Sequence, residues 1–143
     1  MSESIERYSN EMVGLPISHA WRGHGSAIFI EIGSLTKEEN RNQPIGEYSV
    51  MLDCDWRIEG ASEIQCGSIC ESEVIDHSIS ELVGDCIASV ELMGVLKEVT
   101  LILTSGKRVL SFTSDSGQPE WAIFLPNKSW LASKKGSLVC EKA

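Results

Sequence analysis

The stretch "EYSVMLDCDWRIEG", Glu47–Gly60, carries the most regular pattern of the 143-residue chain and decides its fold class. Apolar side chains alternate along it with mostly polar ones, and the apolar set is Tyr48, Val50, Leu52, Cys54, Trp56 and Ile58. A period of two places these side chains on one face of a β-strand, whereas a helix would spread them around its circumference. We therefore expect a single strand over Glu47–Glu59 with one face in the core, and a shorter strand in "EIQCGS".

The stretch "HAWRGHGSAIFIEIG", His19–Gly33, joins two apolar segments through a Gly-His-Gly connection and predicts a β-hairpin. Alternation places three side chains on one face of the first segment: Ile17, His19 and Trp21. It places three on one face of the second: Ile28, Ile30 and Ile32. We expect both sets in the core, with His19 as a hydrogen-bonded core histidine.

The period changes after residue 71 and predicts one helix near residues 73–83. Its stripe of apolar side chains at i, i+4, i+7 and i+8 is Ile75, Ile79, Leu82 and Val83. Ser72 can cap its start, and Gly84 suits its end. Strand patterns then resume in residues 86–93, 98–104, 107–114, 120–125 and 137–141, with Ser105-Gly106 as a hairpin turn.

The expected fold is mainly β (α+β), with antiparallel meander sheets and one helix. Residues 1–12 are expected to form a flexible N-terminal arm or a short helix, and residues 13–143 a single globular domain. Similar patterns recur 70 residues apart, which suggests a pseudo-repeat of 14–68 and 84–143, duplicated into a sandwich or a partly closed barrel. Residues 33–46 form a polar loop that is mobile or functional.

Charge and composition narrow the function classes. Hydrophobic residues make up 42% of the chain, enough for a core. The net charge is −9, and residues 1–100 alone hold 18 acidic and 6 basic residues. Such an acidic chain disfavours nucleic acid and suits a basic partner. No apolar run is long enough to span a membrane, and the polar start has no signal core, so we expect a cytoplasmic bacterial protein with five free cysteines.

The motif "WRGHGSAIFIEIG", Trp21–Gly33, followed by the G-E start and W-R end of Gly46–Arg57, resembles a group of small bacterial proteins. That group carries W-R-G-x-G-S-A-[LI]-F-x-E-x-G and has no assigned activity. The resemblance extends from Gly14 to Trp121, and the chain departs from it at Cys54, where the group has a second tryptophan. It implies a single-domain bacterial protein and transfers no catalytic residues.

Polar side chains near the predicted hairpin form a candidate cluster, composed of His19, Arg22, His24, Asp53, Asp55 and Arg57. As metal ligands the two histidines would need further partners, such as Glu31 or Asp53, and a core histidine is the more usual interpretation of His19. "GHGSA" lacks the helix of a nucleophile elbow. Acidic neighbours oppose a thiolate at Cys66 or Cys70 with His77 as base. We expect no catalytic set, no metal and no cofactor, and structural roles for the two arginines, stacked on tryptophan or paired with acids across strands.

Three function hypotheses follow. The leading one is a non-catalytic module that binds a basic protein, as an immunity protein binds its toxin, with Trp130 as a partner anchor beside lysines. The first alternative is a small enzyme or a ligand- or metal-binding protein that uses His19, His24 and the Asp53/Asp55 face. The second is a self-associating structural subunit, such as a homodimer, with a buried strand edge. No membrane partner is expected.

Overall fold

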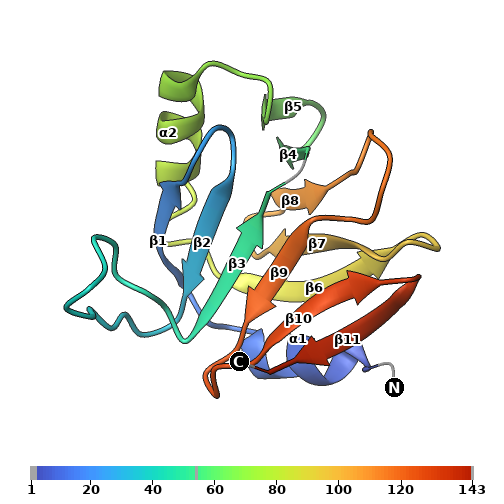
Figure 1. Ribbon diagram of the computed structural model, residues 1–143. Helices are drawn as coiled ribbons and strands as arrows, with labels where there is room; N and C mark the ends of the chain where they lie inside the picture. Colours follow the sequence, from blue (N-terminus) through green and yellow to red (C-terminus); the bar gives the residue numbers. More distant parts are fainter. Residues whose placement is uncertain (1–2, 54, 143) are drawn as a thin grey trace.

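The computed structural model describes residues 3–53 and 55–142, and within them the chain is mainly β, as predicted (Figure 1). The elements are α1 (Ile5–Met12), β1 (Ile17–Arg22), β2 (Ile28–Ile32), β3 (Tyr48–Leu52), β4 (Trp56–Glu59), β5 (Ile64–Gly67), α2 (Ser72–Ser80), β6 (Ile87–Met93), β7 (Glu98–Leu103), β8 (Arg108–Ser111), β9 (Trp121–Phe124), β10 (Trp130–Lys134) and β11 (Ser137–Glu141).

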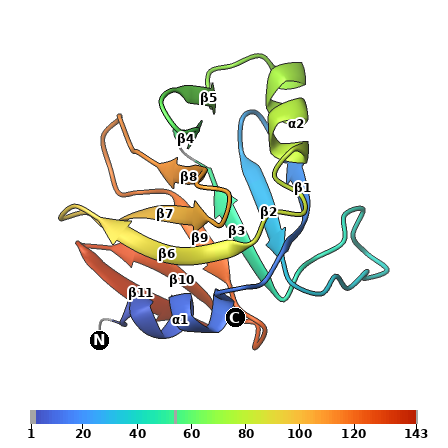
Figure 2. The same ribbon diagram turned by 180° about the vertical axis from the view of Figure 1, so that it is seen from behind.

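The strands form two antiparallel sheets around one core. The six-stranded sheet has the order β1-β2-β3-β9-β10-β11, and the five-stranded sheet has the order β5-β4-β8-β7-β6. Apolar side chains from both sheets and both helices belong to the same buried cluster. The sheets remain separate and open, so of the two expected architectures the barrel does not form. Figure 1 shows the six-stranded sheet in front of the five-stranded sheet, and Figure 2 shows the molecule from behind, with β6 and β7 of the five-stranded sheet in front.

The segment Glu47–Glu59 is two strands, so the prediction of a single strand was wrong. Leu52 at the end of β3 pairs with Trp121 in the six-stranded sheet, and Trp56 at the start of β4 pairs with Ser111 in the five-stranded sheet. The apolar side chains still alternate with polar ones across the two strands, because both strands turn their apolar side toward the shared core. Cys54, which was expected in the core, lies outside the described residues.

A β-bulge in β1 overturns the expected place of His19. The pairing of β1 with β2 shifts between Ile17 and His19. An extra residue in one strand reverses the side to which the following side chains point. Ile17 is therefore fully buried in the core, whereas His19 and Trp21 lie on the outer face of the six-stranded sheet.

The helices differ from the prediction in number and in their ends. Of the two expectations for residues 1–12, the helix forms, and α1 packs against β6 with Met12 fully buried. The second helix, α2, begins at Ser72 with Glu71 as its N-cap residue, and no side chain caps it. Strand β10 also forms, in a stretch between the two last predicted strands for which no strand was predicted.

The two halves of the chain make matching contacts with each other. Gly14 N donates to Ile87 O, and 70 residues later Gly84 N donates to Ile17 O. The bulge of β1 recurs in β6 between Ile87 and Ser89. Each half begins with a helix and a three-stranded meander, then crosses to the other sheet, which gives the molecule a pseudo-twofold arrangement.

Two buried tryptophans form hydrogen bonds between the two sheets. Trp56 Nε1 donates to Ser26 O in the β1–β2 turn at 2.8 Å, and Trp121 Nε1 donates to Lys97 O in the β6–β7 turn at 2.9 Å. Each tryptophan is the first residue of the strand that has crossed to the other sheet. They are the counterparts of one another in the two halves, and each indole ties a strand of one sheet to a hairpin turn of the other sheet within the same half of the chain.

Neither helix of the described chain has the length and apolar character needed to cross a lipid bilayer.

Candidate functional site

A cavity of about 670 Å³ lies on the outer face of the six-stranded sheet. One row of residues on this face runs through the paired strands from β1 to β11: His19, Glu31, Ser49, Phe124, Trp130 and Glu141. Four of these, Glu31, Ser49, Phe124 and Trp130, line the cavity. The small side chain of Ser49 separates the larger ones and leaves the floor of the cavity open.

Aromatic side chains form two sides of the cavity. Trp21 and Phe29 stack with ring centroids 4.1 Å apart and an interplanar angle of 8°. On the other side, Phe124 and Trp130 pack at 6.2 Å with a tilt of 46°. The tilted Phe124/Trp130 pair has a geometry that aromatic rings prefer, and the Trp21/Phe29 rings lie nearly parallel in close contact. The two pairs therefore present ordered apolar surfaces to the cavity.

A buried carboxylate lies between these pairs. Glu31 is 1% exposed, Trp21 Nε1 donates to its Oε2 at 2.8 Å, and Gly46 N donates to its Oε1 at 3.0 Å. Both donors are uncharged. Among the residues that the structure describes, no lysine, arginine or histidine forms an ion pair with Glu31.

The long loop 33–46 forms the third side of the cavity. At its end, a Cβ on Gly46 would lie 2.5 Å from Ile32 N, so only glycine allows the approach that brings Gly46 N to Glu31. At its start, Ser34 N donates to Glu47 Oε1 at 2.8 Å. Within the loop, Thr36 and Ile45 pair through their backbones. The loop is thus attached to the sheet at both ends and contributes to the site.

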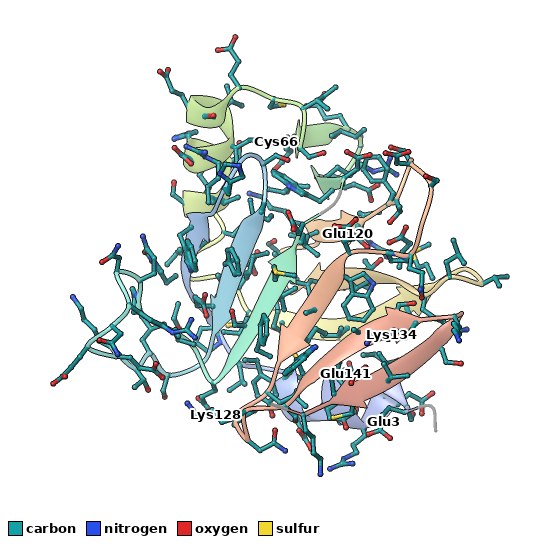
Figure 3. All side chains as sticks on the ribbon, in the orientation of Figure 1. Glu3, Cys66, Glu120, Lys128, Lys134 and Glu141 are labelled. Carbon is teal, nitrogen blue, oxygen red and sulfur yellow. The ribbon has the colours of Figure 1, made fainter. Side chains whose placement is uncertain are left out.

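The charges at the rim of the cavity are centred on Glu38. Arg41 Nε lies 3.4 Å from Glu38 Oε2, and Lys128 Nζ lies 3.5 Å from Glu38 Oε1. Lys128 belongs to the β9–β10 turn at the lower end of the sheet (Figure 3). Glu38 therefore links the long loop to this turn and pairs with both cationic side chains that line the cavity.

The structure separates the predicted polar cluster. None of its six members, His19, Arg22, His24, Asp53, Asp55 and Arg57, lines the cavity. His19 Nε2 lies 2.7 Å from Gln43 Oε1 in a hydrogen bond that holds the long loop. Asp55 accepts hydrogen bonds from Ser68 and Ser114, while Asp53 and His24 are exposed. The cluster fails to converge because β3 and β4 belong to different sheets.

The two arginines make structural contacts, and neither guanidinium stacks on the ring of its neighbouring tryptophan. Arg22 Nε lies 2.8 Å from Asp76 Oδ1 and joins β1 to α2. Arg57 Nε lies 2.8 Å from Glu59 Oε2 on the same strand, and its guanidinium lies 5.3 Å from the centroid of the Phe112 ring. Both arginines thus pair with an acidic side chain, but neither pair runs across two strands as was expected.

The cysteine pair lacks the setting of a nucleophile. Burial raises the pKa of the Cys66 thiol, which opposes thiolate formation. His77 is exposed on α2, and its Nε2 lies 3.5 Å from Glu81 Oε1. Within residues 3–53 and 55–142, no group of three metal-ligating side chains is close enough to hold an ion.

Trp130, the predicted partner anchor, lies half-buried at the cavity beside Lys128. Sequence reasoning did not place the other components at one site: Phe124 was not singled out, and loop 33–46 was raised as mobile or functional without a location. The outward position of Phe29 and Glu31 was predicted by alternation. An aromatic side chain on the expected solvent side of a strand, as at Phe29 and Phe124, was the available signal.

Comparison with models of protein families, with curated proteins and with solved structures finds no match to this chain. The resemblance carried by Trp21–Gly33 therefore stays a prediction.

Proposed function

We propose that this protein is a non-catalytic binding protein that holds a basic segment of a partner protein on the outer face of its six-stranded sheet. One observation carries the proposal: a cavity of about 670 Å³ on that face, lined by four aromatic side chains and three carboxylates. Tryptophan and other aromatic residues dominate the binding energy of protein interfaces when a partner desolvates them. Trp21, Phe29, Phe124 and Trp130 supply such residues at one place.

Charge complementarity selects a basic partner. The chain has a net charge of −9, and the two cations at the cavity already pair with Glu38. The remaining carboxylates there, Glu31 and Glu47, accept hydrogen bonds from uncharged donors. A basic segment would meet unbalanced negative charge at the cavity, and a toxin domain neutralised by an immunity protein is one such partner.

The proposal includes the cytoplasmic location expected from sequence. The described cysteines, Cys66, Cys70, Cys86 and Cys140, are free thiols, as is usual in a reducing compartment.

The two alternatives have less support. An enzyme built on His19, His24 and the Asp53/Asp55 face would need these groups at one cavity, and they do not line this one. A self-associating subunit would need free strand edges. Glu3 N donates to Leu138 O at the β11 edge, Ser9 Oγ accepts from Val90 N at the β6 edge, and α2 packs against β1.

The test is a titration with three unstructured peptides of equal length, in which serine alternates with lysine, glutamine or glutamate. Binding is followed by NMR chemical shifts of the backbone amides and the tryptophan indoles. We expect the lysine peptide to bind most tightly, to shift the signals of Trp21 and Trp130, and to weaken with added salt. Equal binding of the lysine and glutamine peptides would contradict a basic partner.

A pair of variants tests the binding face. Phe124→Ala removes a cavity side chain, and Val95→Ala removes an exposed apolar side chain in the β6–β7 turn, away from the cavity. We expect Phe124→Ala to weaken binding of the lysine peptide about fivefold or more, and Val95→Ala to leave it unchanged. Equal effects of the two substitutions would place the interface elsewhere.

A further inference from the structure

We infer that Glu31 is the buried counter-ion of one lysine or arginine side chain of the partner, which enters the cavity between the Trp21/Phe29 and Phe124/Trp130 pairs. The inference rests on the proposed function and names the chemical group that the cavity selects. It assigns a specific role to the only residue of the row from His19 to Glu141 that is both charged and fully enclosed among those described.

Burial of Glu31 without a cation is the first observation. A carboxylate removed from water loses hydration that two hydrogen bonds from neutral groups replace only in part. Trp21 Nε1 and Gly46 N each occupy one oxygen, and each oxygen keeps a further lone-pair direction. His19, the cross-strand neighbour of Glu31, directs Nε2 to Gln43 instead. The carboxylate thus retains acceptor capacity.

The cations already present at the cavity are held elsewhere. Arg41 and Lys128 both pair with Glu38, which lies in the long loop. Glu31 lies on β2, and its environment is set by the sheet and by Gly46. Two cations on one carboxylate leave the Glu38 cluster with one positive charge in excess, and Glu47, which also lines the cavity, supplies one negative charge. The charge of Glu31 on the cavity floor is then the one left for an incoming group.

The two aromatic pairs are placed to contact the aliphatic part of the incoming lysine or arginine side chain. Phe124 and Glu31 lie in one row across β9, β3 and β2, so their Cα atoms are about two strand spacings of ~4.8 Å apart. A long aliphatic side chain can place its methylenes between the rings and its charged end at the carboxylate. The faces of tryptophan and phenylalanine also attract the cation itself. Stacking on Phe29 and the bond to Glu31 hold Trp21 ready for this contact.

A double-mutant cycle tests the inference. One member is a Gly-Ser peptide with a single central lysine, compared with the same peptide carrying 6-hydroxynorleucine, in which a hydroxyl replaces the ammonium, so that the length is kept and the charge is lost. The other is Glu31→Gln, with Glu120→Gln as the control. Glu120 lies at the other end of β9 from Lys128 and outside the cavity lining (Figure 3).

For the wild-type protein and Glu120→Gln, we expect 6-hydroxynorleucine in place of lysine to weaken binding by about tenfold or more. For Glu31→Gln, we expect the two peptides to differ by less than about twofold, because the charge has lost its counter-ion. A tenfold difference that persists in Glu31→Gln overturns the inference and leaves the proposed function intact. Failure of the lysine peptide to bind the wild-type protein at all is instead the failure of the proposed function.

Glutamine at position 31 can accept from only one of the two donors with its single carbonyl, so Glu31→Gln can disturb the fold. If it does, NMR spectra of the complex with the wild-type protein test the inference. In the complex, we expect the ε-methylene protons of the peptide lysine to shift upfield and to show NOEs to the rings of Trp21 and Phe29. Binding without these signals overturns the inference.

Discussion

At the scale of single residues, two tyrosines connect α1 to its surroundings. Tyr8 Oη donates to Glu3 Oε1 at 2.7 Å, and Tyr48 Oη donates from β3 to Glu11 Oε1 at 3.0 Å. Burial of each ring, followed by the hydrogen bond to the carboxylate, raises the pKa of both tyrosines to about 12. Both effects disfavour the phenolate in the folded state.

The raised pKa values predict a loss of stability in alkali. Because the folded pKa lies above the ordinary value of 10.0, the tyrosines contribute fully below pH 10, and this contribution is lost as the pH rises from about 10 to about 12. The chain has only these two tyrosines, so phenolate absorbance reports on them alone. We expect both to titrate near pH 12 in the folded protein.

The control for this titration is the double variant Tyr8→Phe, Tyr48→Phe. Its free energy of unfolding should depend less on pH between about 10 and 12 than that of the wild type, with lysine titration common to both. Titration of both phenols near pH 10 in the folded state would show that the two hydrogen bonds are absent in solution.

At the scale of secondary-structure elements, the bulge in β1 creates the site. Without it, strict alternation would place His19 and Trp21 on the side of Ile17, in the core. With it, Trp21 stacks on Phe29 outside the sheet and donates to Glu31. The second bulge, in β6, lies in the other half, where the residues paired across β6 and β7 at the corresponding place are Glu91 and Thr100. The same bulge thus occurs in both halves, but it brings aromatic side chains together only in the first half.

The two helices predict a matched pair of stability effects. Met12 ends α1 and Leu82 follows α2, and both side chains are fully buried at corresponding places. Met12→Ala and Leu82→Ala should each lower the free energy of unfolding by about 2–5 kcal/mol. The adjacent residues Val13 and Val83 are 51% and 46% exposed, so alanine there should change it by about 0.5 kcal/mol or less.

Urea denaturation of the four single variants measures these differences. If Met12→Ala costs no more than Val13→Ala, α1 does not pack on the core in solution. The N-terminal residues would then be the flexible arm that was one of the two expectations.

At the scale of the whole molecule, the crossings make the two sheets interdependent. Each half of the chain places strands in both sheets, since β3 ends at Leu52 in one sheet and β4 begins at Trp56 in the other, and β8 and β9 separate after Ser111. Trp56 and Trp121 then bond back to the hairpin turn of the other sheet. Neither sheet can unfold without removing strands, core and indole contacts from its partner.

A single cooperative unfolding transition is therefore expected. Tryptophan fluorescence follows side chains in both sheets, because Trp56 belongs to the five-stranded sheet and Trp21, Trp121 and Trp130 to the six-stranded one. Far-ultraviolet circular dichroism follows the backbone of all strands. The two denaturation curves should coincide. Separate midpoints for the two signals would mean that the sheets are independent units.

The sequence by itself determined the local alternation and hence the mainly β class. Ile28, Ile30 and Ile32 are buried as predicted, and Phe29 and Glu31 point outward, because side-chain direction within one regular strand follows from a period of two. The helix near 73–83 and the Ser105-Gly106 turn were equally local and were correctly located within a few residues. These features depend on residues close together in the chain.

Only the tertiary structure decided which strands share a sheet and which outward side chains meet. The alternation of Tyr48–Ile58 is the same whether the strand stays in one sheet or crosses to another, so Asp53 and Asp55 were assigned to a face that does not exist. Phe124 reaches the side of Ser49 and Glu31 through β9, more than 70 residues along the chain. The site therefore depends on the pairing of strands that are far apart in the chain and on a one-residue bulge. The local alternation of apolar and polar residues indicates neither of them.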